Sequence, residues 1–173
     1  RAAIPPRFAP ERVRRALHQR FEDPLWERSS QGCISCGTCT FSCPTCHCFD
    51  MQDEMTGNDG VRQKNWDGCM FPLFTLHTSG HNPRTERAAR WRQRVSHKFR
   101  YYPDKFGQVL CTGCGRCLRL CPGGLDLVDV LQDLDRSGAA VEAPAQLPVL
   151  VLDSPGVPAS RPEGSDNLYR PYL

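Results

Sequence analysis

Two cysteine runs constrain this chain more than any other feature of its sequence. Cys33–Pro44 reads CISCGTCTFSCP, and Cys111–Pro122 reads CTGCGRCLRLCP. Each run spaces its four cysteines by two, two and three residues and ends in Cys-Pro. This spacing is typical of proteins that hold two [4Fe-4S] clusters, in which the fourth cysteine of each run ligates the other cluster. The sequence therefore predicts a fold that is organised around metal.

Cross-ligation assigns the eight cysteines of the two runs to two sets. We expect one cluster on Cys33, Cys36, Cys39 and Cys121, and the other on Cys111, Cys114, Cys117 and Cys43. The glycines Gly37, Gly113 and Gly115 are expected to allow the unusual backbone dihedrals of a loop that wraps a cluster. Two zinc sites, each with four cysteine ligands, are the alternative, but a zinc knuckle usually separates its two cysteine pairs, whereas each run here is continuous.

Three further cysteines, Cys46, Cys48 and Cys69, lie outside this pattern. Free cysteines are often buried as small apolar side chains, which is one interpretation. The other is a third metal site, which His47, Asp50, His77 or His81 would complete. His18 and His97 show no partner pattern and are expected to be structural or exposed. We find no catalytic triad, dinucleotide-binding loop or haem motif, so we expect no substrate chemistry on this chain itself.

Composition limits the class of protein further. The chain has 173 residues, of which 39% are hydrophobic, with 15 Pro and 14 Gly, so bound metal is expected to supply part of the folding free energy. Eleven cysteines, an odd number, argue against a pure disulfide framework, and the Cys-x-x-Cys steps indicate a reducing compartment. No apolar run approaches the ~20 residues that span a bilayer, and we see no signal peptide, so we expect a cytoplasmic protein.

Hydrophobic periodicity predicts four helices. They cover Pro10–Phe21, Leu25–Ser30, Arg84–Phe99 and Leu125–Gly138. The first carries Arg12, Arg14, Arg15 and Arg20 on its other face, as a solvated surface or as a docking face for an acidic partner. The third has cations at Arg87, Arg90, Arg94 and Lys98, and is expected to end within Arg100–Lys105. Residues 51–65 are polar, with two glycines, and are interpreted as loop.

The expected fold is mainly α with much irregular structure. Because a long insert with a helix and no convincing alternating strands separates the runs, a helical-ferredoxin-like dicluster [4Fe-4S] domain is favoured over the hairpin type. We expect an N-terminal helical arm at 1–31, the dicluster domain at 32–138 with a 44–110 insert, and an extended Pro-rich tail at 139–173.

Five segments together carry a family resemblance. They are CGTCTFSCPTCHCFD at 36–50, WDGC at 66–69, GHNPR at 80–84, RVSHKF at 94–99 and CTGCGRC at 111–117. The chain resembles the iron-sulfur beta subunit of cytoplasmic NAD(P)-linked [NiFe] hydrogenases (sulfhydrogenases) and is similar to the iron-sulfur subunit of anaerobic sulfite reductases, over about Phe21 to Leu134. Members of that family carry a sizeable domain before the first run, so such a domain is either encoded outside this sequence or absent from this branch.

The resemblance implies an electron-relay subunit of a flavin-linked oxidoreductase complex. Its partners would be a flavin subunit that handles NAD(P)H and the small and large hydrogenase subunits, or a sirohaem subunit in the sulfite reductase relatives. FAD and the NiFe centre would lie on those partners. Two alternatives stay open: a free ferredoxin-like carrier, and a zinc-stabilised nucleic-acid-binding module that uses the basic helix at 84–100. We favour no nucleic acid and no membrane span.

Overall fold

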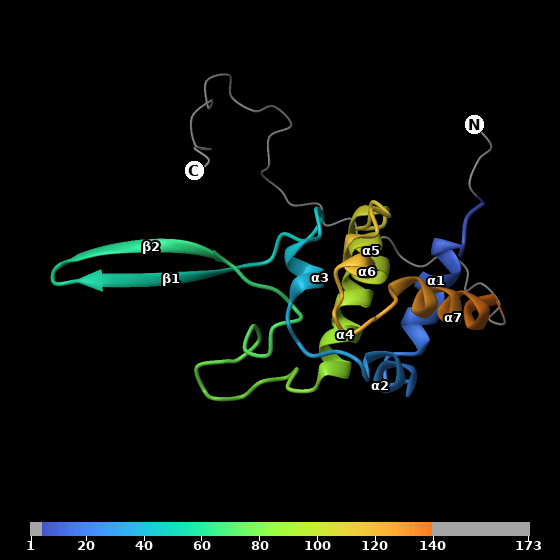
Figure 1. Ribbon diagram of the computed structural model, residues 1–173, viewed down its shortest axis with the longest axis horizontal. Helices are drawn as coiled ribbons and strands as arrows, with labels where there is room; N and C mark the ends of the chain where they lie inside the picture. The colour runs from blue at the N-terminus through green and yellow to red at the C-terminus, as the bar shows by residue number, and fades with distance from the viewer. Residues whose placement is uncertain (1–4, 140–173) are drawn as a thin grey trace, which may run out of the picture.

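The computed structural model describes residues 5–139 and shows a helical body from which one β-hairpin projects (Figure 1). The elements are α1 (Pro10–Gln19), α2 (Leu25–Ser30), α3 (Thr38–Phe41), β1 (Phe49–Thr56), β2 (Asp59–Trp66), α4 (Arg87–Ser96), the π-helical turn η1 (His97–Tyr101), α5 (Tyr102–Phe106), α6 (Arg116–Arg119) and α7 (Leu127–Ala139). The four predicted helices are present as α1, α2, α4 and α7. The tail beyond Ala139 lies outside the described residues.

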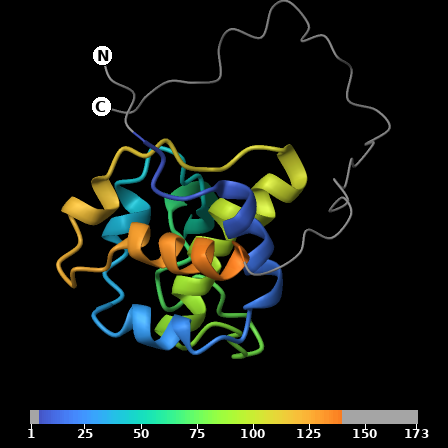
Figure 2. The same cartoon turned by 90° about the vertical axis from the view of Figure 1, so that its right-hand side faces the viewer.

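Helices α1 and α7 pack side by side, as Figure 2 shows. Val13 and Leu17 of α1 and Leu134 of α7 are buried at their interface. A Cβ on Gly138 would lie 2.2 Å from the carbonyl oxygen of Arg12, so a larger residue there would push the two helices apart. The helix of the predicted N-terminal arm is therefore part of the same core as the helix that follows the second cysteine run.

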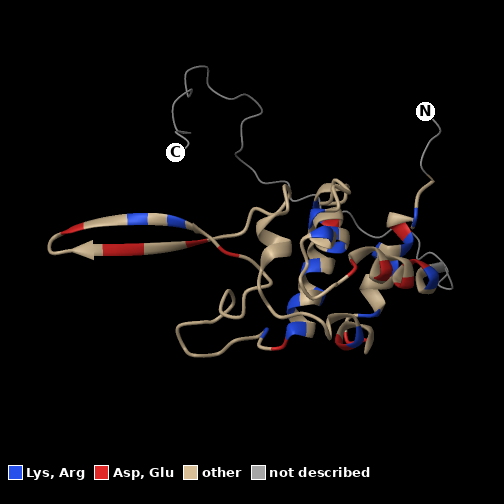
Figure 3. Ribbon diagram, viewed as in Figure 1, with Lys and Arg blue, Asp and Glu red and all other residues tan. Residues whose placement is uncertain are grey.

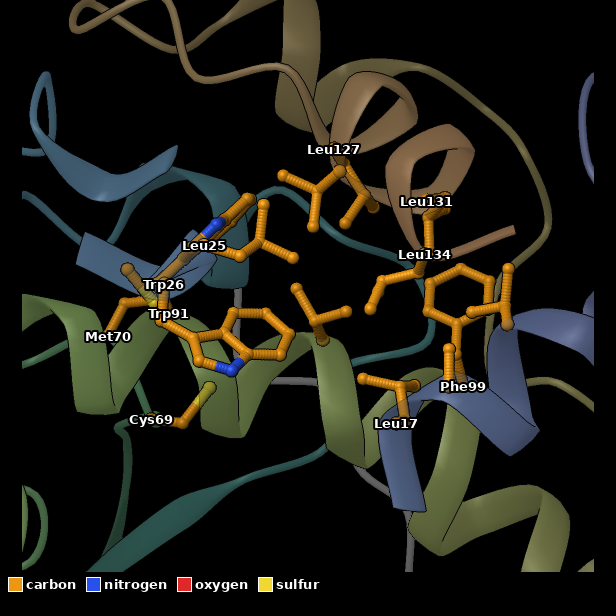
Figure 4. Close-up of a cluster of buried hydrophobic side chains, with 14 residues drawn as sticks. Leu17, Leu25, Trp26, Cys69, Met70, Trp91, Phe99, Leu127, Leu131 and Leu134 are labelled. Atoms are coloured by element: carbon orange, nitrogen blue, oxygen red, sulfur yellow. The ribbon is translucent and has the colours of Figure 1, made fainter. Parts of the chain in front are cut away.

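Helices α2 and α4 complete this core (Figure 4). Trp26 and Trp91 pack into it, and each indole N–H finds an acceptor: Trp26 donates to the Arg20 carbonyl at 2.8 Å and Trp91 to the Ser29 hydroxyl at 3.1 Å. Met70, which follows the hairpin, is also buried here. Because buried aromatic N–H groups need partners, the Trp91 bond fixes how α4 lies against α2, and the Trp26 bond ties α2 to the end of α1.

The helical chain does not end within Arg100–Lys105 as predicted. After α4 it widens into the π-helical turn η1 and continues as α5 to Phe106. The Tyr102 N–H bonds to the His97 carbonyl, and Pro103, which stands in the first turn of α5, has no N–H to offer to Lys98. The Lys98 carbonyl instead accepts the N–H of Leu110 at 2.9 Å. The carbonyl that Pro103 leaves free thus connects the helix to Leu110, the residue just before the second cysteine run.

The interpretation of 51–65 as loop is wrong. β1 and β2 form an antiparallel hairpin in which Phe49 pairs with Trp66 and Thr56 pairs with Asp59. Gly57, with φ +64°, and Asn58 form the two-residue turn, which is a known hairpin signal. Both faces of the hairpin are largely exposed, and the apolar/polar alternation is incomplete: Asp53 interrupts the series Phe49, Met51 and Met55 in β1, and β2 is mostly polar. The preference for a helical-ferredoxin-like domain rested partly on an insert without strands, and that part of the argument is therefore wrong.

The basic face of α1 makes internal ion pairs. Arg12 pairs with Asp135 of α7 at 2.7 Å, Arg14 pairs with Asp104 of α5, and Arg20 pairs with Asp23 at 2.7 Å. These side chains are therefore engaged within the chain, and the docking interpretation of this face loses its basis. No helix among residues 5–139 is both long enough and apolar enough to cross a membrane.

Candidate iron-sulfur site

Each cysteine run folds in the same way. A glycine in the left-handed region, Gly37 with φ 70° or Gly115 with φ 70°, precedes a single helical turn, α3 or α6, and these two turns pack against each other. A Cβ on Gly37 would lie 2.1 Å from the Phe71 ring, so glycine is required there for space as well as for its φ. Gly113, with φ 67°, also takes the left-handed region. The predicted dihedral role of all three glycines is confirmed.

Ser35 occupies in the first run the place that Gly113 has in the second. It is the one described non-glycine residue with positive φ, at 59°. Its N–H donates to the Cys33 sulfur at 3.4 Å, and its hydroxyl accepts a bond from the buried guanidinium of Arg90 at 2.7 Å. A non-glycine residue in this region signals local strain that its surroundings maintain. No sequence signal points to it, because serine is an ordinary loop residue.

The first cavity lies between the two runs and encloses about 440 Å³, part of it open to solvent. Its lining includes the cysteines Cys33, Cys36, Cys39, Cys117 and Cys121. The rest of the lining is apolar or uncharged, from Ile34, Gly37, Thr38, Met70, Trp91, Leu118, Pro122, Gly123, Leu125 and Leu127. The fourth cysteine of the second run thus lies with the first three of the first run.

The second cavity encloses about 300 Å³. Its cysteines are Cys43, Cys111, Cys114 and Cys117, and its remaining lining is Arg94, Lys98, Thr112, Gly115 and Leu127. The fourth cysteine of the first run lies here with the first three of the second run. Cys117 lines both cavities and so stands in the wall between them.

Two close contacts hold the runs in this arrangement. Gly32, just before the first run, meets Gly123, just after the second: a Cβ on Gly123 would lie 1.9 Å from the Gly32 carbonyl oxygen. The equivalent pair on the other side is Leu110 and Thr45, where the Thr45 hydroxyl donates to the Leu110 carbonyl at 3.1 Å. Each contact brings the start of one run to the end of the other, which is the geometry that cross-ligation needs.

Three basic side chains of α4 and η1 point inward, toward the first cysteine run and the residues just after it, whereas Arg92 pairs with Glu22 and Arg100 bonds to the Leu17 carbonyl; Figure 3 shows the cations along the helix. Arg90, Arg94 and Lys98 are all buried. Lys98 Nζ donates to the Cys43 sulfur at 3.3 Å, and Arg94 Nη1 donates to the Cys46 sulfur at 3.6 Å. Three cations of the basic helix on which the nucleic-acid alternative depended are therefore interior, whereas Arg87 is exposed.

The electrostatics of the second cavity follow from these contacts. The bond from the Cys46 thiol lowers the pKa of Cys43 to about 3, with help from Thr45 and Lys98 and against the opposing effect of burial. The same bond, together with burial, raises the pKa of Cys46. Burial lowers the pKa of Arg94, but the surrounding cysteine thiolates outweigh burial and leave it raised. The second cavity thus favours a bound anion.

The chemistry of these donors fits two [4Fe-4S] clusters. All eight cysteines are free thiols, and each cavity gathers at least four of them. Among residues 5–139, no three Cys, His, Asp or Glu side chains come together closely enough to hold a single metal ion. A cube binds its four thiolates through four different irons, so its ligands stand apart, whereas the ligands of one zinc ion converge. Buried Arg94 keeps Nε and Nη2 without partners, as expected beside an anionic group.

The structure brings the cysteines of the predicted third metal site near one another, but its histidines have other neighbours. Cys46 and Cys48 line a small cavity with Asp67 and Trp66, while buried Cys69 belongs to the hydrophobic core. Burial raises the pKa of Cys69 to about 11, and Cys48 is close enough to add to this effect. Three of the histidines expected to complete the site pack on other imidazoles: His77 and His81 on each other, with ring centroids 5.4 Å apart, and His47 on His97, at 5.9 Å.

Comparison with known proteins agrees with this geometry. Residues 32–125, more than half of the chain, match the 4Fe-4S dicluster domain. The chain belongs to the 4Fe-4S dicluster domain family. It carries two [4Fe-4S] clusters and is an iron-sulfur electron-transfer protein. It is similar to sulfhydrogenase 2 subunit beta of Pyrococcus furiosus, with 35% identity over 115 residues.

That similarity covers 66% of this chain and 34% of the relative, so the chain spans about a third of the length of that curated protein. It supports an iron-sulfur beta subunit of the sulfhydrogenase type. No solved structure matched the chain significantly. The dicluster domain ends at residue 125, so α7, α1 and α2 lie outside the matched range.

Proposed function

We propose that this dicluster protein is the electron-transfer subunit of a cytoplasmic, flavin-linked oxidoreductase complex, and that an NAD(P)-linked [NiFe] hydrogenase is the best candidate for that complex. The observation that carries the proposal is the pair of adjacent cysteine cavities with Cys117 in their shared wall. Clusters held on either side of one cysteine are close enough to pass electrons. FAD and the NiFe centre would belong to partner subunits.

The proposed ligand sets are Cys33, Cys36, Cys39 and Cys121 for the first cluster and Cys43, Cys111, Cys114 and Cys117 for the second. Cys117 is given to the second because that cavity has only three other cysteines, whereas the first keeps four without it. This arrangement corresponds to a helical-ferredoxin-like domain, with proposed bounds of 32–138, between segments 1–31 and 139–173. The hairpin is an addition to that architecture.

Alanine variants of two neighbouring cysteines test the ligand sets. Cys117 and Cys121 are four residues apart, yet they are assigned to different clusters. Cys117→Ala and Cys121→Ala should each lose about half of the iron, about four atoms per chain, with different EPR signals remaining. Cys39→Ala should leave the same signal as Cys121→Ala. If Cys39→Ala and Cys121→Ala leave different signals, the cross-ligated assignment is wrong.

The β-hairpin is the proposed contact with a partner subunit of the complex. In the strand register, Phe49, Met51, Met55 and Trp66 share one face, and all four are exposed, Met55 to 68%. An isolated two-stranded hairpin is marginally stable in water, so a hairpin of this length that projects from the body needs a surface to rest on. A partner with a complementary apolar surface would supply it.

Co-purification separates this proposal from a free ferredoxin-like carrier. Expressed with its neighbouring genes, the protein should purify with a flavin subunit and hydrogenase subunits; a sirohaem subunit in their place would identify the anaerobic sulfite reductase alternative. A stable monomer with no partner would favour the free carrier. A third metal at Cys46, Cys48 and Cys69 stays a prediction, which metal counts above those of two cubes would support.

A further inference from the structure

The two cavities differ in charge although their cysteine runs are alike. Uncharged side chains alone line the first cavity, with Trp91, Met70 and Leu125 among them. The second has two cations in its wall, Arg94 and Lys98. The two cavities are alike in solvent exposure, because each contains one exposed cysteine, Cys36 in the first and Cys114 in the second.

These two cations are unusually isolated from acidic side chains. Arg94 is 1% exposed and Lys98 is 2% exposed. Among residues 5–139, no Asp or Glu forms an ion pair with either of them, whereas Arg12, Arg14, Arg20, Arg62 and Arg92 all have carboxylate partners. A buried charge is costly unless something opposite neutralises it. Within the described part of the chain, the anionic groups in reach are the cysteine sulfurs and whatever they bind.

The position of Lys98 is fixed at both of its ends. Its backbone carbonyl accepts the Leu110 N–H at 2.9 Å, and its Nζ donates to the Leu110 carbonyl at 3.0 Å and to the Thr45 hydroxyl at 2.9 Å. The ammonium group therefore cannot swing away from the Cys43 sulfur. Arg94 stands one helical turn earlier on the same helix face and lines the same cavity.

We propose that Lys98 is a positioning residue that makes the Cys43–Cys111–Cys114–Cys117 cluster the more easily reduced of the two. Arg94 acts on both clusters, because Cys39 of the first set and Cys117 of the second both lie near its guanidinium. The inference rests on the proposed ligand sets. One-electron reduction adds one negative charge to a cluster, and a fixed cation close by stabilises that charge and raises the potential. Within this chain, an electron would then move downhill from the first cluster to the second.

Backbone hydrogen bonds to sulfur act in the opposite sense but are weaker. The first set receives two, from Ser35 to Cys33 at 3.4 Å and from Leu125 to Cys121 at 3.3 Å. The second receives one, from Gly113 to Cys111 at 3.5 Å. Because a hydrogen bond from a charged donor is about twice as strong as a neutral one, one extra amide does not offset the buried charge of Lys98 on Cys43.

The test is an EPR-monitored redox titration of the full chain, poised with dithionite and mediators. Lys98→Met removes the charge from a side chain of similar length and should lower the midpoint potential of the second cluster. At the wild-type midpoint, the ratio of reduced to oxidised cluster should fall about tenfold, which corresponds to about 59 mV. Arg94→Met should lower both midpoints, because Cys39 and Cys117 belong to different sets. Lys98→Arg keeps the charge and should restore the midpoint of the second cluster. The same variants in the Cys121→Ala background show the second cluster alone.

Two controls separate charge from structure. Lys98→Arg, which keeps the charge, is the first of them. Arg92→Met removes a cation of the same helix that pairs with Glu22 at 2.8 Å, and should change neither midpoint. A wild-type protein without two cubes would overturn the ligand sets and this inference together. Two intact cubes whose midpoints are the same in Lys98→Met as in wild type would overturn this inference alone.

Discussion

Gly32 and Gly123 meet backbone to backbone, so closely that a Cβ on Gly123 would lie 1.9 Å from the Gly32 carbonyl oxygen. One glycine stands immediately before Cys33 and the other two residues after Cys121. The contact therefore fixes the first and last members of the proposed first ligand set relative to each other.

Gly123→Ala should weaken this contact between Gly32 and Gly123. Because the clash is with backbone, the chain must shift, at a cost of about 1–3 kcal/mol or more. We expect a lower melting temperature and loss of iron from the first cluster, measured by thermal unfolding and iron content. Gly60→Ala is the matched control, since its Cβ would meet chiefly the flexible end of Met55 in the hairpin. Equal iron content in both variants would contradict the predicted role of the contact.

The hairpin should be dispensable for the clusters and required for assembly. Replacing residues 51–64 with a short Gly-Ser link removes Met51 and Met55 of the exposed face but none of the residues that line the two cysteine cavities. We expect unchanged iron content and loss of the partner subunits on affinity purification. Leu73→Ala, at an exposed residue outside the hairpin, is the control and should keep the partners. Full retention of partners without the hairpin would contradict the docking proposal.

The α1–α7 interface should contribute strongly to stability. Leu134 is fully buried there, so Leu134→Ala should cost about 2–5 kcal/mol. Leu120→Ala, at a half-exposed position, should cost much less. Chemical denaturation of both variants under anaerobic conditions measures the difference. Similar midpoints for the two variants would show that α7 is not an integral part of the core.

Asp135 should make stability dependent on pH. The hydrogen bond from Arg12 lowers the pKa of Asp135, against the opposing effect of burial and with help from the Ala9 N–H. A lowered folded-state pKa stabilises the protein above the unfolded value, about 3.9, and that stability is lost as the pH falls through the folded pKa. Asp135→Asn should therefore melt lower than wild type from pH 8 to pH 5, with the gap closing below about pH 4.

The exposed pair in the hairpin provides the control for that experiment. Arg62 and Asp53 are also 2.7 Å apart, but both side chains are more than half exposed. Exposed pairs contribute little to stability, so Asp53→Asn should leave the melting temperature unchanged at every pH. If the two variants behave alike, the Arg12–Asp135 pair does not connect α1 to α7 in the way described.

The sequence predicted the parts of the fold that depend on local pattern. Val13 and Leu17 repeat at helical spacing, and α1 begins at Pro10 as expected. The cysteine spacing alone paired Cys121 with Cys33 and Cys43 with Cys111, and the cavities bring these residues together. The hairpin was missed because its alternation is incomplete, with Asp53 between Met51 and Met55 and a mostly polar β2, although Gly57-Asn58 between two runs of similar length was a usable signal.

The burial of Arg94 and Lys98 was beyond the sequence. Cations on a helix are usually solvated, and nothing local distinguishes these two from Arg92, which is paired with Glu22. What buries them is the cysteine run that packs over α4, a contact between segments far apart in the chain. The contact between Gly32 and Gly123 could not be predicted from the sequence for the same reason, because it depends on how distant segments approach each other.

The most direct test of the account is the count of iron and acid-labile sulfide in the anaerobically purified protein, together with EPR of the reduced sample. Two cubes predict about eight irons and about eight sulfides per chain, with a brown colour, and two interacting paramagnets after reduction. A colourless protein that contains zinc, or one with a single cube of four irons, would contradict it.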